Sequence, residues 1–205
     1  SGTQSDIDIN SSIRARGNGM KKILKEYRAI FPTPAALITS VDEEGRPNIA
    51  TAGESFMMSL YPLVVAVGFR PATYTNGLIH KTREFVVNLP SREILKAVDY
   101  CGSTSGRNVD KFKATGLTPL PAKFVRPPLI KECPVNIECR VRGIVTFGSH
   151  DVFAGDSLAI HADEDILGGD GLPDISRCPT IAYANNRYYI VDTLIEEHGF
   201  SIKKR

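Results

Sequence analysis

The sequence of 205 residues contains no tryptophan, only four cysteines and no long apolar run. Its longest apolar stretch, Leu63–Phe69 (LVVAVGF), is far shorter than the roughly 20 residues that a membrane-spanning helix needs. No basic segment followed by an apolar core opens the chain. We therefore expect a cytoplasmic protein that has no membrane partner.

The cysteines, Cys101, Cys133, Cys139 and Cys178, form no CxxC pair and none of the spacings typical of zinc ligands. The sequence thus predicts no metal site. Buried, unreactive thiols are the ordinary interpretation, and a reactive thiol at Cys101 is the alternative.

Charge of either sign is nearly balanced, since Lys and Arg total 25 against 23 Asp and Glu, for a net charge of +2. Polyanion binding requires clustered cations, so this balance argues against a nucleic-acid partner, and any bound anion should be small. The nucleotide motifs GxxxxGK[ST] and GxGxxG are also absent. These absences disfavour a kinase and a Rossmann dehydrogenase.

The length allows one full domain, which we place at residues 18–205, after a flexible N-terminal segment at 1–17. Apolar periodicity predicts a short helix at Met20–Tyr27 and further helices near 73–82, 91–100 and 109–115. The predicted strands lie at 35–41, 48–52, 62–69, 84–90, 135–145 and 151–163, with a final hairpin at 181–191. Strands joined mostly by hairpins, with helices inserted between them, indicate a mainly β, antiparallel barrel rather than a doubly wound sheet.

One loop, YCGSTSGRNVDKF at Tyr100–Phe112, has the composition of an anion site. Backbone N–H groups at a glycine-permissive bend, hydroxyls and one or two cations are the groups that hold a phosphate. The loop supplies all of them, in Gly102, Gly106, Ser103, Thr104, Ser105, Arg107 and Lys111. The glycines would allow backbone angles that other residues avoid. The alternative is a solvated Gly/Ser turn before a helix.

A second candidate turn is GFRPATYTN, where Arg70 follows the end of an apolar strand. Thr73, Tyr74 and Thr75 stand at an expected helix start, where N–H groups are free to meet an anion. The alternative is an N-cap with an exposed arginine. The two turns could serve a single phosphate, or their similarity could be coincidence.

Taken together, these segments resemble the flavin reductase-like family of FMN-binding split barrels, which includes the flavoredoxins. The match runs from about Phe31 to Lys204. The segments that carry it are PTPAALITSVDEEGRPNIAT, PLVVAVGFRPATYTNGLIHKTREFVVNLP, DYCGSTSGRNVDKF with GLTPLPA, PLIKECPVNIECRV and GSHDVFAGD. The resemblance implies a six-stranded antiparallel split β-barrel that forms a homodimer and binds FMN non-covalently at the subunit interface.

The resemblance also implies which residues contact the cofactor. The ring would lie against Ala52, Gly53, Glu54, Ser55, Phe56 and Met57, and the phosphate against Arg70, Thr73, Tyr74, Thr75, Asn76, Ser105, Gly106, Arg107 and Lys111. TAGESFMM offers small residues, a hydroxyl donor and soft apolar walls, although a loop that merely joins two strands is the alternative. Many relatives carry Trp where this chain has Glu54. A carboxylate there would disfavour an anionic reduced flavin if it pointed inward, but it could equally point to water.

His150 stands where relatives have a histidine after a strand, so the resemblance makes it a candidate contact to flavin or nicotinamide. A turn histidine bonded to backbone is the alternative. His80, His161 and His198 show no metal-ligand spacing.

The expected activity is that of an NAD(P)H-dependent flavin reductase, in which bound FMN accepts a hydride from NADH or NADPH and passes electrons to flavin or another acceptor. The flavin would carry the chemistry, so no set of catalytic side chains is required. The first alternative is a flavoredoxin-like electron-transfer protein reduced by a protein partner. The second is a small β-barrel module that binds nucleic acid, for which a basic groove with aromatics would be expected.

Overall fold

The computed structural model describes residues 20–27 and 29–202. The chain divides into two compact units, and the helices and strands of the described residues lie in the unit formed by residues 30–193. The described residues of the other unit, 20–27, 29 and 194–202, contain turns but neither helix nor strand. The expected flexible segment at 1–17 lies outside the described residues.

The predicted helix at Met20–Tyr27 is wrong. Its apolar side chains are spaced for a helix but remain exposed, with Met20 at 92% and Ile23 at 97% of full exposure. A helix this short is marginal in water unless one face packs against another element. Periodicity without a packing surface therefore did not suffice here.

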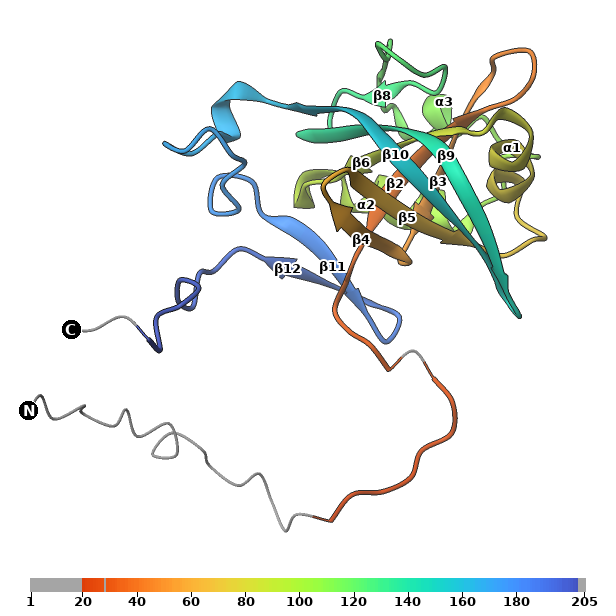
Figure 1. Ribbon diagram of the computed structural model, residues 1–205. Coiled ribbons are helices and arrows are strands. Elements are labelled where there is room, and N and C mark those ends of the chain that lie inside the picture. Colours follow the sequence, from red (N-terminus) through yellow and green to blue (C-terminus); the bar gives the residue numbers. More distant parts are fainter. Residues whose placement is uncertain (1–19, 28, 203–205) are drawn as a thin grey trace, which may run out of the picture. The chain divides into compact units, whose positions relative to one another are not determined.

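The main sheet contains seven strands, all paired antiparallel, in the order β3-β2-β6-β9-β10-β5-β4 (Figure 1). They are β2 (Ala36–Val41), β3 (Pro47–Ala52), β4 (Ser55–Leu60), β5 (Leu63–Phe69), β6 (Glu84–Leu89), β9 (Val135–Phe147) and β10 (His150–Ala162). The sheet is not closed, because β3 and β4 are its two edges. The resemblance implied six strands; the seventh, β4, includes the apolar residues that the sequence placed in a ring-binding segment.

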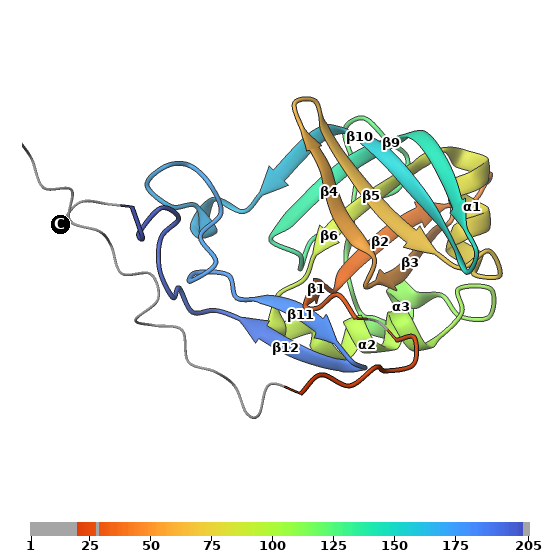
Figure 2. The same ribbon diagram turned by 60° about the horizontal axis from the view of Figure 1, so that its bottom comes forward.

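The sheet curls around its own core (Figure 2). Alternate side chains of its strands point inward and pack together with one residue of helix α1 (Tyr74–Thr82). This cluster comprises Ala36, Ile38, Ala52, Val65, Val67, Phe69, Ile79, Phe85, Val87, Cys139, Val141 and Phe153. Burial of one face from six strands explains why an open sheet adopts a barrel-like curvature.

Strand β2 is buried on both faces, because a second cluster covers its outer side. Leu37 and Ile49 pack there against helices α2 (Leu95–Ser103) and α3 (Lys111–Thr115). This packing fixes the end of α2 and the loop after it beside β3, as Figure 2 shows. The predicted helical turn ending at Gly116 is confirmed, with Gly116 in the left-handed region at φ 73°.

A separate three-stranded sheet has the order β1-β11-β12, formed by β1 (Thr33–Pro34), β11 (Thr180–Ala184) and β12 (Arg187–Val191). The predicted hairpin is confirmed, and its turn residues Asn185 and Asn186 both have positive φ. The proline-rich connector contains a short pair, β7 (Pro119–Leu120) with β8 (Leu129–Ile130). The 3-10 turns η2 (Arg92–Ile94) and η3 (Glu164–Ile166) complete the elements. Within the described residues, no helix has the length and apolar character needed to cross a bilayer.

Helix α1 links β5 to β6 and is held at both ends. The sequence offered Thr73 or Thr75 as the cap, and the structure has Thr73, whose hydroxyl accepts a hydrogen bond from the backbone amide of Asn76. Further along, His80 lies 3.0 Å from the Asp151 carboxylate on β10. The helix N-terminus is therefore fixed relative to the sheet, and it is this end that contributes to the site.

Candidate functional site

The two turns singled out in the sequence meet in space and frame one cavity of about 400 Å³. Residue 107 of one turn and residue 72 of the other are 35 positions apart in the chain. The floor comes from β3 and the end of β5. The lining residues are Ala50, Thr51, Phe69, Ala72, Thr73, Tyr74, Thr75, Cys101, Gly102, Ser103, Thr104, Ser105, Gly106, Arg107 and Lys111.

Arg107 joins the two turns directly. Its guanidinium donates to the Ala72 carbonyl oxygen at 3.0 Å and lies 5.5 Å from the centre of the Tyr74 ring. These contacts pre-position a planar cation at the cavity wall, where further N–H donors can meet a phosphate.

Lys111 is the buried cation of the site, with 4% of its surface exposed. Its Nζ donates to the Cys101 carbonyl oxygen at 2.7 Å, and no ion pair to it occurs within the described part of the chain. Burial lowers the pKa of the Lys111 ammonium, and the partner that offsets such a penalty is normally an anion. A cavity beside this group is suited to a phosphate.

The glycines of the loop act through space rather than through unusual backbone angles. Neither Gly102 nor Gly106 has a positive φ, so the conformational reason inferred from the sequence is wrong. A Cβ on Gly106 would overlap the side-chain oxygen of Asn48, and one on Gly102 would come within 3.2 Å of the Thr51 side chain. Both positions require close approach of the loop to β3.

Not every residue of the first turn points its side chain into the cavity. Thr75 accepts a hydrogen bond from Asn48, and the Asn76 amide donates to Asp151 at 2.8 Å and to the Phe69 carbonyl oxygen. The Asn76 side chain therefore attaches α1 to β5 and β10 and does not point into the cavity. The Arg70 side chain is exposed and does not line the cavity, so its predicted phosphate contact would require the side chain to reach over the rim.

The predicted ring-binding segment lies next to the cavity in sequence but does not line it. Ala52 faces the core, and Gly53 and Glu54 are half-buried. The Ser55 hydroxyl is buried and has no hydrogen-bond partner in the described structure. Phe56 and Met57 are exposed on β4, the edge strand. Small residues, an unpaired hydroxyl and an open apolar edge are the features expected beside a flat ring.

His150 is half-buried at the start of β10, beyond the β9–β10 turn, and its Nδ1 lies 2.8 Å from the Ser149 hydroxyl. Its neighbour Asp151 pairs with Phe69, which lines the cavity, so the antiparallel register brings His150 alongside Arg70. The cofactor contact of His150 stays a prediction. Within the described residues, no cluster of three metal-ligating side chains occurs.

Cys101 borders the cavity, but its side chain is buried in the second apolar cluster, and burial raises the pKa of the thiol to about 11. A thiol with this pKa is protonated at neutral pH, so the alternative of a reactive cysteine is disfavoured. Cys133 and Cys139 are also buried, as the sequence predicted, whereas Cys178 is partly exposed.

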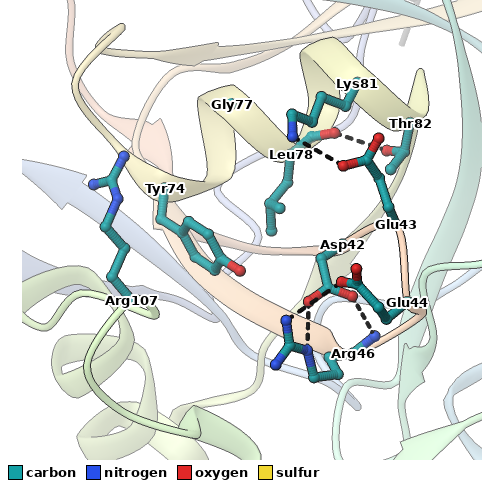
Figure 3. Close-up of a pocket in the computed structure, with 10 residues that line it drawn as sticks. All are labelled: Asp42, Glu43, Glu44, Arg46, Tyr74, Gly77, Leu78, Lys81, Thr82 and Arg107. Atoms are coloured by element: carbon teal, nitrogen blue, oxygen red, sulfur yellow. Dashed lines mark hydrogen bonds and ion pairs between the residues drawn. The ribbon is translucent and has the colours of Figure 1, made fainter.

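A second hollow of about 340 Å³ shares Tyr74 and Arg107 with the first cavity, and Figure 3 shows the residues that line it. Two of its cations are paired with carboxylates of the hollow, Lys81 with Glu43 at 2.9 Å and Arg46 with Asp42 at 2.6 Å, and Arg107 at its border bonds to the Ala72 carbonyl oxygen. Three carboxylates border it, counting Glu44. An anion is therefore favoured in the first cavity, where the buried ammonium has only a carbonyl partner, and disfavoured in the second.

Sequence reasoning missed one buried residue of the site, Asn48, which lies beneath the loop and beside the helix start. It belongs to the apolar-looking strand NIATA, and only its polarity among buried neighbours could have marked it.

A curled antiparallel sheet with an anion-suited cavity at the junction of two turns defines a small, mainly β protein. Comparison with known proteins identifies the protein family. The chain belongs to the flavin reductase like family, because the model of the flavin reductase like domain matches residues 27–192.

Three solved structures illustrate the relationship. The chain is similar to flavoredoxin of Desulfovibrio vulgaris (Miyazaki F), with 34% identity, a TM-score of 0.83, and coverage of 90% of this chain and 100% of that one. It is similar to the FMN-binding protein from Thermus thermophilus with bound 1-cyclohex-2-enone, at 25% identity and TM-score 0.73, covering 87% and 97%. It shares its fold with a split barrel domain protein from Shewanella frigidimarina, at 20% identity and TM-score 0.73, covering 81% and 85%.

Proposed function

We propose that this protein binds FMN non-covalently and acts as an NAD(P)H-dependent flavin reductase. Family membership supports a flavoprotein oxidoreductase, and the FMN-binding neighbour from Thermus thermophilus supports the choice of flavin. The observation that carries the proposal is Lys111, a buried cation that faces a cavity and lacks a carboxylate partner in the described residues.

The residues present fit FMN. A cavity of about 400 Å³ falls within the range of ligand sites, roughly 300–1,000 Å³. The Ser105 hydroxyl and the cations of Arg107 and Lys111 suit the phosphate, whereas the Thr73 hydroxyl donates to the Arg70 carbonyl oxygen and caps the helix. The unpaired, buried Ser55 hydroxyl suits a polar edge of the ring. When bound, FMN would supply hydride acceptance from a nicotinamide and electron delivery to an acceptor.

The role of the chain in this proposal is binding, orientation and exclusion of water. Lys111 and Arg107 would neutralise the phosphate, the Ser105 hydroxyl would donate to it, and the segment Ala52–Met57 would support the ring. Glu54 is half-buried at this segment, and a carboxylate that faced the ring would oppose added negative charge there.

The completed site would contain a second copy of the chain. Strand β4 is an open sheet edge and carries exposed apolar side chains, among them Phe56, Met57, Met58 and Leu60. Such an edge is normally covered, and a homodimer would cover it while enclosing the ring. The nicotinamide nucleotide would enter at the remaining open face.

A second candidate is an electron-transfer protein whose FMN is reduced by a protein partner. The likeness to flavoredoxin, with a TM-score of 0.83, favours it. Both functions use one cavity, and they differ in the electron donor. The charge balance of the chain still speaks against the nucleic-acid alternative, which tight, salt-sensitive oligonucleotide binding would revive.

The test is an anaerobic titration of the FMN-loaded protein with NADH and with NADPH, followed by the visible absorbance of the flavin. Bleaching of the flavin absorbance by either nucleotide at the rate of enzyme turnover supports the reductase. If neither nucleotide bleaches the flavin but a reduced ferredoxin-type protein does, the electron-transfer protein is favoured instead. Failure to retain FMN in equilibrium dialysis would reject both.

A further inference from the structure

Asn48, on β3, lies where the two phosphate-suited turns meet the sheet. It is 5% exposed and does not line the cavity. Its Nδ2 donates to the Thr75 hydroxyl at 2.9 Å and to the Ser40 hydroxyl at 3.3 Å. Its Oδ1 lies against Gly106, so closely that a Cβ at Gly106 would overlap it.

This contact pattern connects one side chain to both turns. Thr75 belongs to the first turn of α1, and Gly106 is the centre of the loop after α2. Ser40 is the cross-strand partner of Asn48 on β2 and belongs to neither turn. Asn48 therefore supports one turn by a hydrogen bond and the other by direct contact.

The Asn48 carboxamide keeps one polar atom without a hydrogen-bond partner in the described structure, the Oδ1 under Gly106. If the amide were rotated by 180°, the hydroxyls of Ser40 and Thr75 could donate to the oxygen instead, and the nitrogen would face Gly106 unpaired. In either orientation a buried polar atom lacks a partner, which is unfavourable and unusual in a folded protein. The two hydrogen bonds to Ser40 and Thr75 hold the amide in place, while the unpaired atom lies against the loop that frames the cavity.

We propose that Asn48 is a positioning residue that sets the spacing of the two turns and thereby makes the site selective for a phosphorylated flavin. This inference rests on the proposed function. Asn48 acts through Thr75 and Gly106, since a ligand in the cavity cannot touch it. Phosphate recognition depends on the simultaneous reach of both turns, whereas ring binding does not.

The experiment compares Asn48→Ala with the matched control Ser40→Ala, which removes the other hydrogen-bond partner of the same amide. Dissociation constants for FMN and for riboflavin are measured by quenching of flavin fluorescence, together with the melting temperature of each ligand-free variant. We expect Asn48→Ala to weaken FMN about tenfold and riboflavin less than about twofold, while Ser40→Ala leaves the ratio of the two unchanged.

A second variant keeps the shape of the side chain. Asn48→Asp places a carboxylate beneath Gly106, so it should weaken FMN at least as much as Asn48→Ala does and again spare riboflavin. If Asn48→Ala fails to fold, Asn48→Asp and Asn48→Ser, which shortens the side chain beneath Gly106, provide the same comparison.

Equal weakening of FMN and riboflavin in these variants would show that Asn48 only supports the fold, and would overturn the inference. An unchanged FMN affinity would overturn it as well. Wild-type protein that binds neither flavin would reject the proposed function itself. Failure of the inference alone is therefore distinguishable, because there the wild type still binds FMN.

Discussion

The guanidinium of Arg107 donates a hydrogen bond to the carbonyl oxygen of Ala72 across 3.0 Å and so connects two turns that are 35 residues apart in the chain. The two residues joined by this bond line one side of the candidate phosphate cavity. Because the Tyr74 ring lies on the same guanidinium, the side chain is held in place before any ligand arrives.

Replacing Arg107 by alanine should weaken FMN binding by roughly tenfold or more, the effect of losing a charge-assisted hydrogen bond, and leave riboflavin binding nearly unchanged. Arg70→Ala should act in the same direction but less strongly, because its side chain is exposed outside the cavity. Equilibrium dialysis with both flavins measures the two effects. If a variant loses equal affinity for FMN and for riboflavin, the arginine that it replaces does not bind the phosphate.

Lys111→Met should reduce FMN affinity by about ten- to a hundredfold, because a buried ammonium contributes more than an exposed one. The free energy of unfolding of the ligand-free variant should be unchanged or higher, since a buried charge without an ion pair is removed. Lys113→Met, two residues along on α3 and 87% exposed at its side chain, is the matched control. If Lys111→Met binds FMN as tightly as the wild type does, Lys111 does not bind the phosphate and the proposal loses its main support.

Gly106→Ala should impair FMN binding because the new methyl group would overlap the Asn48 side chain and push the loop outward. Gly77→Ala, inside α1, meets open space and should stabilise the helix by about 1 kcal/mol. Thermal unfolding and FMN titration of both variants test the pair. Normal FMN binding by Gly106→Ala would mean that the loop does not need its close approach to β3.

The Asp151 carboxylate gives a pH dependence. Hydrogen bonds from Asn76, His80 and Thr146 lower its pKa from 3.8 to about 2. A carboxyl group whose folded-state pKa is depressed contributes stability above its ordinary pKa and loses it as the pH falls through the folded value. The stability advantage of wild type over Asp151→Asn should therefore shrink between about pH 4 and pH 2. Chemical denaturation across this range measures it, and a constant difference would contradict the assignment.

The open edge strand predicts the assembly state. Met57→Glu should shift the proteins toward monomers, because it places a charge in the apolar surface that a second copy would cover. Leu172→Glu, at a residue of similar exposure in a loop, is the control. Sedimentation velocity distinguishes the species. A wild-type monomer at micromolar concentration would reject the dimer.

The parts of the fold that depend on local signals could be predicted from the sequence. The hairpin of β2 and β3, with Gly45 at φ 82° in its turn, was expected from two strand-like runs separated by the turn residues Gly45 and Pro47. The cap at Thr73 and the helix end at Gly116 followed from the same kind of local chemistry.

The parts that depend on distant segments could not. The alternation of apolar and polar residues along β9 places Glu138 on the solvent-facing side of the strand. In the structure its side chain is fully buried. Its carboxylate accepts hydrogen bonds from the backbone N–H groups of Lys123, Phe124 and Val125 in the proline-rich connector. Strand β4 was missed because its apolar residues face outward at a sheet edge, so no period marks it. The composition of the two turns indicated an anion, but their meeting at Asn48 is a property of the folded chain.

The cavity walls come from several stretches of the chain: strand β3, the end of β5 with the turn that leads into α1, the end of α2 with the loop after it, and the start of α3. No unfolded molecule presents these groups together, so a ligand that fills the cavity binds the native state alone. By mass action, loss of that ligand during purification would lower the melting temperature. Adding the ligand back would raise the melting temperature progressively with ligand concentration, up to the solubility of the ligand. The heat tolerance of this protein in a cell would then report how much cofactor the cell supplies.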